Sequence, residues 1–241
     1  FERLVRETLP DIVSMENVPN LIHENVFRDF VRTLNELHYE VEYQVVNCPD
    51  YGVPQHRKRL ALLASRFGEI HLIPPLYDAE HYITVRDAIG HLQPIEAGEI
   101  CPDDILHRSS ALSAINMERI QQSVPGGTWR DWDENLRLKC HRKESGATFP
   151  SVYGRMEWDE PSPTMTTQFY GYGNGRFGHP EQNRAISLRE GAILQSFPDD
   201  YIFIDDLHPA KKRELGTHIG NAVPVELGRA IGMSIQQHLT E

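Results

Sequence analysis

The sequence predicts an α/β protein, and three observations near its beginning support this. Residues 24–38 carry apolar side chains at helical spacing and lie between two strand-like segments, 11–15 and 41–46. Residues 60–64 form a continuous apolar run, which is typical of a strand buried on both faces of a sheet. A further helical pattern covers 1–9. Strands and helices in this order predict part of a parallel sheet, with ligands bound beyond the carboxyl ends of its strands.

The composition changes after residue 65, where Pro, Gly, Asp and His become frequent and helical spacing is found only at 109–123. This segment predicts a small, mostly irregular domain with short strands. Helical patterns return at 187–195, 209–215 and 224–239, and the first of these opens with a Ser-x-x-Glu capping pattern.

The formal net charge of −11 argues against a non-specific nucleic-acid binder, because phosphate contacts require Lys and Arg. Basic residues are nevertheless clustered at 57–59, 137–143 and 211–213. A DNA-facing cleft with an acidic outer surface fits both observations, while each run taken alone is equally well explained as a solvated face.

No apolar run approaches membrane-spanning length and no signal peptide is present, so we expect no membrane contact and a cytoplasmic location, associated with the nucleoid if the host is bacterial. The first residue is Phe within an amphipathic pattern, which suggests a part of something longer. The 12 His lack the spacing of metal ligands, and we expect no metal. Three widely spaced Cys predict free thiols, and the favoured interpretation of Cys48 is a buried small side chain rather than a nucleophile.

The string MENVP at 15–19 places Glu16 at the carboxyl end of a predicted strand. A carboxyl group removed from solvent there can hold a proton and pass it to a ring nitrogen, which makes a pyrimidine electrophilic. Read alone, so short a string recurs by chance, and a surface glutamate in a loop is the simpler interpretation.

The string QHRKR at 55–59 precedes the apolar run. Alternate residues of an extended segment point the same way, so Gln55, Arg57 and Arg59 can converge on one anionic or carbonyl-rich ligand, such as a phosphate and a base oxygen. The alternative is a charged entry to an edge strand.

The string HIGNAVP at 218–224 precedes the last predicted helix. A Gly-Asn pair ahead of a helix offers backbone N–H groups and an amide to a ligand. An ordinary helix cap, formed by Gly220 or Asn221, explains the string equally well.

Taken in order, these strings change the interpretation. MENVP is followed by GVPQHRKR, then by a long variable stretch, then by LREGAILQSFPD (188–199) and IGNAVP (219–224). This series resembles motifs VI, VIII, IX and X of the cytosine-5 DNA methyltransferases, and the variable stretch resembles their target-recognition domain. The resemblance covers essentially the whole chain, and it implies the later part of a Rossmann-like S-adenosylmethionine-dependent methyltransferase sheet plus a small, mostly irregular or β target-recognition domain.

The domain boundaries implied are 1–75 for the C-terminal part of the catalytic α/β domain, 76–186 for the target-recognition domain, and 187–241 for the motif IX and X helices, the last of which returns to the catalytic domain. Members of this family flip cytosine out of duplex DNA. A Cys thiolate then attacks C6, C5 takes the methyl group of S-adenosylmethionine, and loss of the C5 proton releases the enzyme.

The resemblance also implies roles for individual residues. Glu16 would stabilise the ring protonated at N3, Arg59 would hydrogen-bond the cytosine O2, and Arg57 would position the site or a phosphate. Residues of the later motifs would contact the cofactor, namely Asn221, Ala222 and Phe197. Residues of the variable stretch would contact DNA, namely Arg130, Arg155, Thr164, Thr166 and Gln168.

The chain departs from the family pattern at its beginning, since it contains neither the Gly-rich cofactor loop nor the Pro-Cys nucleophile loop. Three explanations are open: the observed part of a longer enzyme, one polypeptide of a split enzyme, or a non-catalytic relic. We favour the first two, in which an N-terminal half, in cis or as a second polypeptide, shares the cofactor and brings the Cys. Two alternatives are a regulatory or DNA-binding subunit without chemistry and, far less favoured, an unrelated α/β nucleotide binder. The DNA target sequence and the oligomeric state do not follow from the sequence.

Overall fold

The structure is a computed structural model that describes residues 1–143, 145, 148–203 and 211–240. It divides into two compact units. Unit 1 comprises Phe1–His81 and Val223–Glu241, and unit 2 comprises Tyr82–Ala222. The functional labels given above to the predicted domains stay predictions.

Unit 1 is built on a three-stranded sheet in the order β1–β4–β2. The strands are β1 at Ile12–Asn17, β2 at Glu40–Asn47 and β4 at Lys58–Ser65. The central strand β4 is antiparallel to both neighbours, so β1 and β2 run in the same direction. The expected two-sided burial of residues 60–64 is confirmed.

The expectation that all strands of this sheet are parallel is wrong for β4. The connection from β2 to β4 holds only the 3-10 turn η2 (Cys48–Tyr51) and the short strand β3 (Gln55–His56). A parallel return needs a crossover of about a dozen residues or more, usually helical, so this short connection brings the chain back antiparallel.

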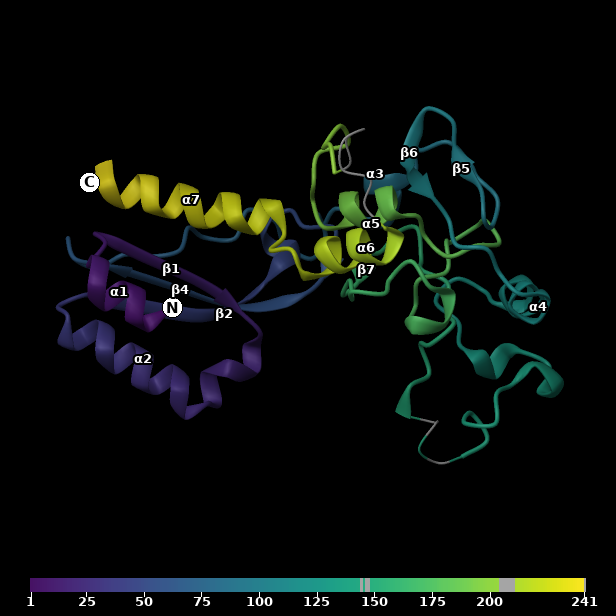
Figure 1. The fold of residues 1–241 in the computed structure, drawn as a ribbon, viewed down its shortest axis with the longest axis horizontal. Helices are drawn as coiled ribbons and strands as arrows, with labels where there is room; N and C mark the ends of the chain where they lie inside the picture. Colours follow the sequence, from purple (N-terminus) through teal and green to yellow (C-terminus); the bar gives the residue numbers. More distant parts are fainter. Residues whose placement is uncertain (144, 146–147, 204–210, 241) are drawn as a thin grey trace. The chain divides into compact units, whose positions relative to one another are not determined.

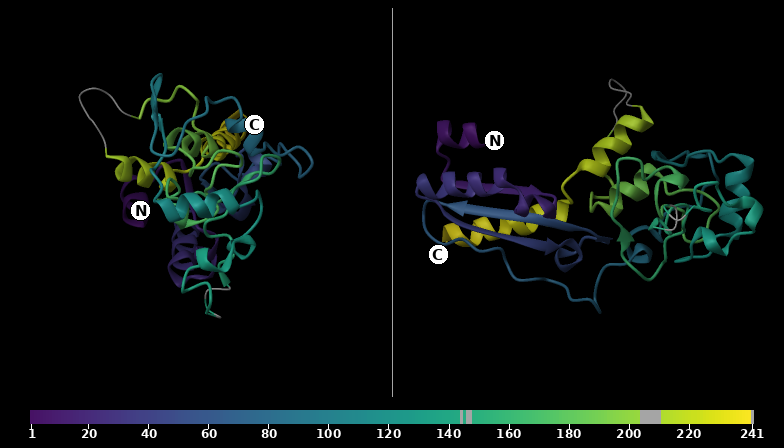
Figure 2. Two further views of the ribbon diagram at one scale, coloured as in Figure 1. Left: turned by 90° about the vertical axis from the view of Figure 1, so that its right-hand side faces the viewer. Right: turned by 90° about the horizontal axis from the view of Figure 1, so that it is seen from below.

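Helices cover both faces of the sheet of unit 1 (Figures 1 and 2). One face is covered by α1 (Glu2–Thr8) and α2 (Asn25–Glu36), which is reached through the 3-10 turn η1 (Pro19–His23). The apolar stripe of α2 buries Phe27, Phe30 and Leu34. The other face packs on α7 (Val225–Thr240), which buries Leu227, Ala230 and Ile231. The helices predicted at 1–9, 24–38 and 224–239 are confirmed in these positions.

Unit 2 has short elements joined by long loops. They are α3 (Val85–Ile89), β5 (Ile100–Cys101), β6 (Asp104–Arg108), α4 (Ala114–Gln122), η3 (Trp129–Asp131), η4 (Glu134–Leu136), β7 (Ser162–Pro163), η6 (Tyr172–Asn174), α5 (Leu188–Leu194) and α6 (Lys212–Asn221). Its largest core surrounds α5, every residue of which is buried. The mostly irregular character predicted from composition is confirmed.

A buried ionic network fixes the start of α5. The predicted capping box is present, since Ser187 accepts from the backbone N–H of Glu190 and the Glu190 carboxylate accepts from the N–H of Ser187. Arg184 donates through two nitrogens to the same carboxylate, each at 2.7 Å. Because both side chains are 1% exposed, this bidentate pair compensates two charges that burial would otherwise make very costly.

Two predicted helix positions require correction. The helix expected at 109–123 begins only at Ala114, after the extended N-cap residue Ser113. The helix expected at 209–215 corresponds to α6, which begins at Lys212 and continues to Asn221; residues 209–210 lie outside the described part of the chain.

Among the described residues, no helix is both long and apolar enough to cross a membrane. The same residues contain no group of three or more His, Cys, Asp or Glu side chains placed to hold a metal ion.

Candidate active site

Glu16 and Arg59 form an ion pair between neighbouring strands of unit 1. Glu16 lies near the carboxyl end of β1 and Arg59 near the start of β4, and Nε of Arg59 lies 2.7 Å from Oε1 of Glu16. The two side chains are only 17% and 14% exposed, respectively. Oε1 of Glu16 is buried and, within the described structure, accepts no hydrogen bond of good geometry. The pair therefore compensates the carboxylate charge and leaves hydrogen-bonding capacity on this oxygen.

Arg57 lies close to the same pair and is itself buried. Its side chain is 4% exposed, and Nη1 lies 3.4 Å from Oε1 of the buried Gln55. Burial and the neighbouring charge of Arg59 lower the pKa of Arg57 to about 10, which still leaves the guanidinium charged at neutral pH. Two cations and one carboxylate thus share a partly desolvated region at the ends of β1 and β4.

Cys48 belongs to the same neighbourhood, at the start of η2. Its backbone N–H donates to the carbonyl of Arg57 at 2.8 Å, and its side chain is fully buried. Burial raises the pKa of the thiol to about 12, although Arg57 and Arg59 act in the opposite direction. A thiol with this pKa is protonated at neutral pH and is a poor nucleophile, as expected for a buried structural Cys.

Unit 2 presents polar side chains on the segment after β7. Thr164, Thr166 and Gln168 are exposed and alternate with less exposed residues, of which Met165 is 2% exposed. The segment lies against α6 where a Cβ atom on Gly220 would come within 2.3 Å of the carbonyl oxygen of Thr166. Only glycine permits this approach, so Gly220 fixes the segment on the helix.

Asn221 and Ala222 end α6 rather than open the next helix. Asn221 is the last residue of α6 and Ala222 is its extended C-cap, while α7 begins at Val225. The alternative in which Gly220 or Asn221 caps the last helix is therefore wrong, because Pro224 interrupts the helical backbone and favours an extended residue before it.

The end of α6 is fixed by a buried amide. Nε2 of Gln195 donates to the carbonyl of Ile219 at 2.8 Å and to that of Gly220 at 3.2 Å. Asn221 is exposed at this end. Phe197, two residues after Gln195, is half-buried and packs edge-on against Phe203 with ring centres 4.9 Å apart. The motif around 195–197 therefore positions the motif around 219–222 within unit 2.

A comparison with protein families matches residues 1–237 to the C-5 cytosine-specific DNA methylase model. The chain belongs to the C-5 cytosine-specific DNA methylase family. The resemblance seen in the sequence is thereby confirmed.

Two of the relatives within this family are bacterial enzymes named Type II. The chain is 54% identical to the Type II methylase M.HgiDII of Herpetosiphon aurantiacus, over 99% of this chain and 68% of the relative. It is 34% identical to the Type II methyltransferase M1.HphI of Haemophilus parahaemolyticus, over 98% of this chain and 59% of the relative. The chain thus spans about three fifths to two thirds of the lengths of these two relatives.

The fold is that of methylase structures. A putative DNA modification methyltransferase encoded within a prophage of E. coli has a TM-score of 0.73 at 21% identity, and the match covers all of this chain and 73% of that one. The Schizosaccharomyces pombe Dnmt2 methyltransferase has a TM-score of 0.54 at 14% identity. These likenesses confirm the methyltransferase fold predicted from the sequence.

Arg130 and Arg155, both expected to contact DNA, differ in their surroundings. Arg130 is exposed, with its guanidinium 5.1 Å from the ring centre of Trp129. Arg155 is 4% exposed, and its guanidinium donates to backbone carbonyls that include those of Ser123 and His179, each at 2.8 Å. Burial and these bonds give Arg155 the role of joining loops, which contradicts the expected DNA contact.

Lys212 lies at the start of α6 and was not among the residues predicted from the sequence to have a function. Its ammonium donates to the hydroxyl of Ser110, which in turn donates to the carbonyl of Tyr170 at 2.6 Å. Burial and the charge of Arg108 lower the pKa of Lys212 to about 8. The basic run at 211–213 was the available signal, but a run of charges does not show which member is partly buried.

Proposed function

We propose that this chain is the base-holding and DNA-recognition part of a DNA (cytosine-5-)-methyltransferase of a restriction–modification system. The observation that carries the proposal is the buried Glu16–Arg59 pair with Arg57 beside it. Family membership and the Type II names of the relatives support this function. Double-stranded DNA is the proposed substrate.

The roles of the pair follow from its donors and acceptors. The Glu16 carboxyl group stabilises the flipped cytosine when N3 is protonated, because a carboxyl group beside the ring can share or accept that proton. In Arg59, Nε faces Glu16 and Nη1 donates to the carbonyl of Lys58 at 2.8 Å, which leaves Nη2 to donate to the base O2. Arg57 adds a second fixed cation, which favours negative charge that develops on the ring.

S-adenosylmethionine, when bound, supplies the methyl group. The exposed amide of Asn221 and the backbone at Ala222 would hold its polar groups, and the half-buried ring of Phe197 would pack against its adenine. The Gly-rich loop that completes such a site in the family is missing from this sequence. We therefore propose that the cofactor is shared with an N-terminal half.

The nucleophile is also proposed to come from that half, in cis or as a second polypeptide. Cys48 and Cys101 are buried, and the pKa of Cys48 is raised to about 12. Cys140 is exposed but lies in unit 2, with no Pro before it. Within the described residues β1 pairs only with β4, so its other edge can receive a further strand.

The proposed DNA contacts are the exposed side chains of unit 2, namely Arg130, Thr164, Thr166 and Gln168. The three on the segment after β7 are held against α6 by the close approach at Gly220. Hydroxyl and amide side chains of this kind bind phosphate oxygens and fix the register of a protein on DNA.

The first experiment measures transfer of a labelled methyl group from S-adenosylmethionine to duplex DNA. The chain is assayed alone and then with an upstream half taken from the M.HgiDII relative. We expect transfer only in the combined assay. Transfer by the chain alone would show that one of its own Cys is the nucleophile and would overturn the division of labour proposed here.

The second experiment separates catalysis from binding. Glu16→Gln in the combined assay is expected to lower transfer about 100-fold to 10,000-fold while DNA affinity is retained. Glu40→Gln, on the exposed end of β2, is the matched control and should leave transfer unchanged. Unchanged transfer in Glu16→Gln would instead favour a DNA-binding or regulatory subunit.

A further inference from the structure

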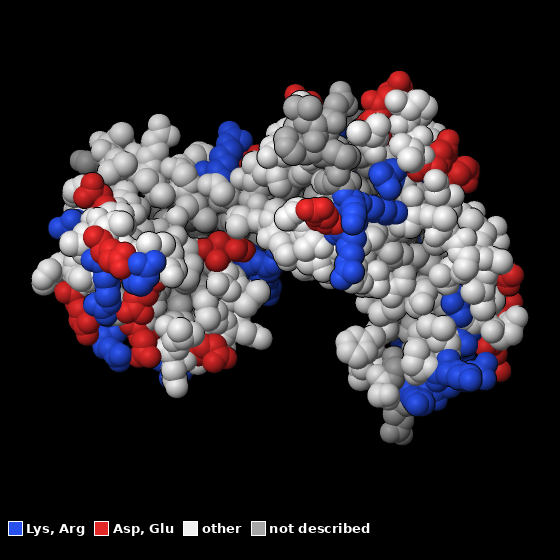
Figure 3. All heavy atoms as spheres, viewed as in Figure 1, with Lys and Arg blue, Asp and Glu red and all other residues white. Residues whose placement is uncertain are grey.

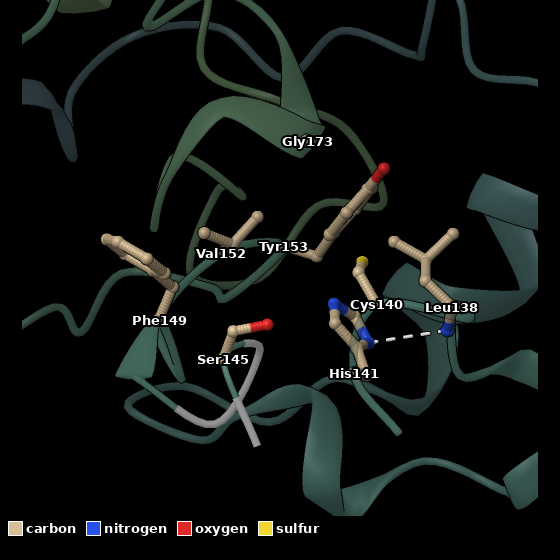
Figure 4. Close-up of a pocket in the computed structure, with 8 residues that line it drawn as sticks. All are labelled: Leu138, Cys140, His141, Ser145, Phe149, Val152, Tyr153 and Gly173. Atoms are coloured by element: carbon tan, nitrogen blue, oxygen red, sulfur yellow. Dashed lines mark hydrogen bonds between the residues drawn. The ribbon is translucent and has the colours of Figure 1, made fainter. Parts of the chain in front are cut away.

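Unit 2 contains a cavity of about 390 Å³ among the loops between η4 and η6 (Figure 4). Its volume lies within the range of about 300 to 1,000 Å³ that is usual for small-molecule sites. Apolar and aromatic side chains dominate the lining, with a few polar groups among them. The lining residues are Leu138, Cys140, His141, Ser145, Phe149, Val152, Tyr153 and Gly173. Neither Glu16 nor Arg59 is among them, since both belong to unit 1.

His141 forms one wall of the cavity and extends an aromatic stack. Its ring lies on Trp129 with ring centres 4.3 Å apart and planes 14° apart. Burial, together with the charges of Arg119 and Arg137, lowers the pKa of His141, so its imidazole is neutral at pH 7. The N–H of Leu138 donates to Nδ1 at 3.4 Å, which assigns the remaining proton to Nε2 (Figure 4). The wall is therefore a flat, neutral ring with one donor.

Tyr153 and Phe149 supply further aromatic surface. The Tyr153 ring stands nearly perpendicular to that of His141, with an interplanar angle of 78°. Phe149 is 67% exposed and offers an open apolar face on the lining of the cavity. In Figure 4 the hydroxyl of Ser145 and the thiol of Cys140 lie between these rings. Flat apolar faces with a few donors and acceptors match a nucleobase, which stacks through its faces and hydrogen-bonds through its edges.

One segment that lines the cavity is strongly basic. Residues 137–143 contain four Lys or Arg and no acidic residue, and three of the four, Lys139, Arg142 and Lys143, are exposed. Basic side chains gather in this part of unit 2 in Figure 3, below the position of α4 in Figure 1. Cations beside an aromatic cavity are the arrangement that binds a nucleic-acid strand, because phosphates pair with the cations while a base stacks within.

We propose that this cavity is a second base-binding pocket, which holds one unstacked nucleobase of the bound DNA other than the target cytosine. The strand that carries this base runs along Lys139, Arg142 and Lys143. This inference rests on the proposed function, because the pocket needs DNA bound to the chain. It adds a base-specific contact to unit 2.

Position-specific disulfide trapping tests this inference directly. Cys140 lines the cavity and is exposed, whereas Cys48 and Cys101 are buried. The target site is first mapped from the methylated product of the active assembly. Duplexes that carry a single base with a thiol-bearing tether, moved one position at a time along each strand, are then mixed with that assembly. We expect a disulfide to Cys140, identified by peptide mapping, at one or two neighbouring positions, and loss of that adduct with the variant Cys140→Ser, while any adduct of the nucleophilic Cys of the upstream half is unchanged.

The second arm measures whether a base and the pocket act together. An abasic site at the trapped position and the variant His141→Leu should each lower DNA affinity about tenfold, and their combination should lower it no further. Phe149→Ala, at an exposed position that truncation does not unfold, should show the same non-additivity. Additive losses for both variants would show that the pocket does not hold that base.

The remaining outcomes separate this inference from the proposed function. Methyl transfer without position-dependent trapping would overturn the pocket alone, and uniform trapping along the duplex would reduce it to a general phosphate-binding surface. Protection of Cys140 by free deoxynucleoside monophosphates, with no trapping in DNA, would assign the cavity to a free nucleotide and overturn the inference. Absence of methyl transfer when the chain is combined with the upstream half would overturn the proposed function itself.

Discussion

Nε of Arg59 lies 2.7 Å from Oε1 of Glu16, and this contact links β1 to the central strand β4. The carboxylate and the guanidinium are both largely removed from solvent, so each depends on the other for compensation of its charge. The same arrangement fixes the acid at one orientation near Arg57. If the pair has the proposed catalytic role, stability and catalysis depend on the same two side chains, and mutation can separate them.

Arg59→Met is expected to lower the free energy of unfolding by about 1–3 kcal/mol, because Glu16 is left buried with an uncompensated charge. Methyl transfer should fall at least 100-fold. The double variant Glu16→Gln/Arg59→Met should recover most of the stability and none of the transfer, as judged by urea unfolding and the labelled-methyl assay. Recovery of transfer in the double variant would remove the catalytic role assigned to the pair.

Arg59→Lys tests the shape of the cation at constant charge. Lys retains the charge that compensates Glu16 but lacks the planar set of donors that reaches two acceptors at once. Thermal stability should therefore remain within about 0.5 kcal/mol of the parent chain, while transfer should fall about tenfold or more. Equal transfer in the two proteins would show that charge alone suffices at this position.

The three thiols should differ sharply in reactivity. At pH 8 an aromatic disulfide reagent is expected to modify Cys140 within minutes, while Cys48 and Cys101 react only after unfolding, because both are buried and the pKa of Cys48 is about 12. Cys48→Ala should retain full methyl transfer and lose about 1 kcal/mol of stability. Loss of transfer in Cys48→Ala at retained stability would make Cys48 the nucleophile.

Local patterns predicted the helices and strands of unit 1 well, because the apolar residues of each element recur at the spacing of a helix or a strand. The orientation of β4 was not predictable from its apolar run, since a strand buried on both faces has the same composition whether it is parallel or antiparallel. It follows from the short connection after β2.

Local sequence patterns were limited in the same way at the candidate site. Order and spacing of short strings identified Glu16, Arg57 and Arg59, which the structure brings together. Arg155 was expected to contact DNA, because it lies in the variable stretch that resembles a target-recognition domain. Its burial depends on carbonyl groups from the end of α4 and from distant loop positions, and no local pattern encodes their convergence.

Gly191→Ala is expected to destabilise unit 2 by about 1–3 kcal/mol. A Cβ atom there would lie 2.0 Å from Cε2 of Phe169, whose ring is fully buried and has no space to move. Gly228→Ala in α7 is the matched control, since a Cβ atom at that position has nothing within 4 Å. The control should stabilise the protein by up to about 1 kcal/mol, because Ala favours a helix over Gly. Thermal melts of both variants check the prediction, and equal melting temperatures would contradict the close packing at Gly191.

Acid should destabilise unit 2 in two successive steps through the network of Arg184, Glu190 and His179. Burial lowers the pKa of His179 to about 4, so the unfolded chain binds one more proton than the folded chain between pH 6.5 and 4. Stability from this residue is complete above pH 6.5 and is lost as the pH falls toward 4. For Glu190, burial acts to raise the pKa, but the hydrogen bonds and charge of Arg184 outweigh it and set the pKa at about 2. The contribution of Glu190 is therefore lost at lower pH, between about 4.5 and 2.

His179→Asn separates the two steps. The Asn side-chain oxygen can replace Nδ1 of His179, which accepts from the N–H groups of Glu181 at 3.1 Å and Gln182 at 2.9 Å, but it does not titrate. The unfolding free energy of the variant, measured by urea titration, should change little between pH 6.5 and 4.5, while the parent chain should lose up to about 3 kcal/mol between pH 6.5 and 4. Both proteins should then lose stability below pH 4.5 as Glu190 is protonated. The same slope in both proteins above pH 4.5 would place the titrating group elsewhere, since His179 is the residue removed.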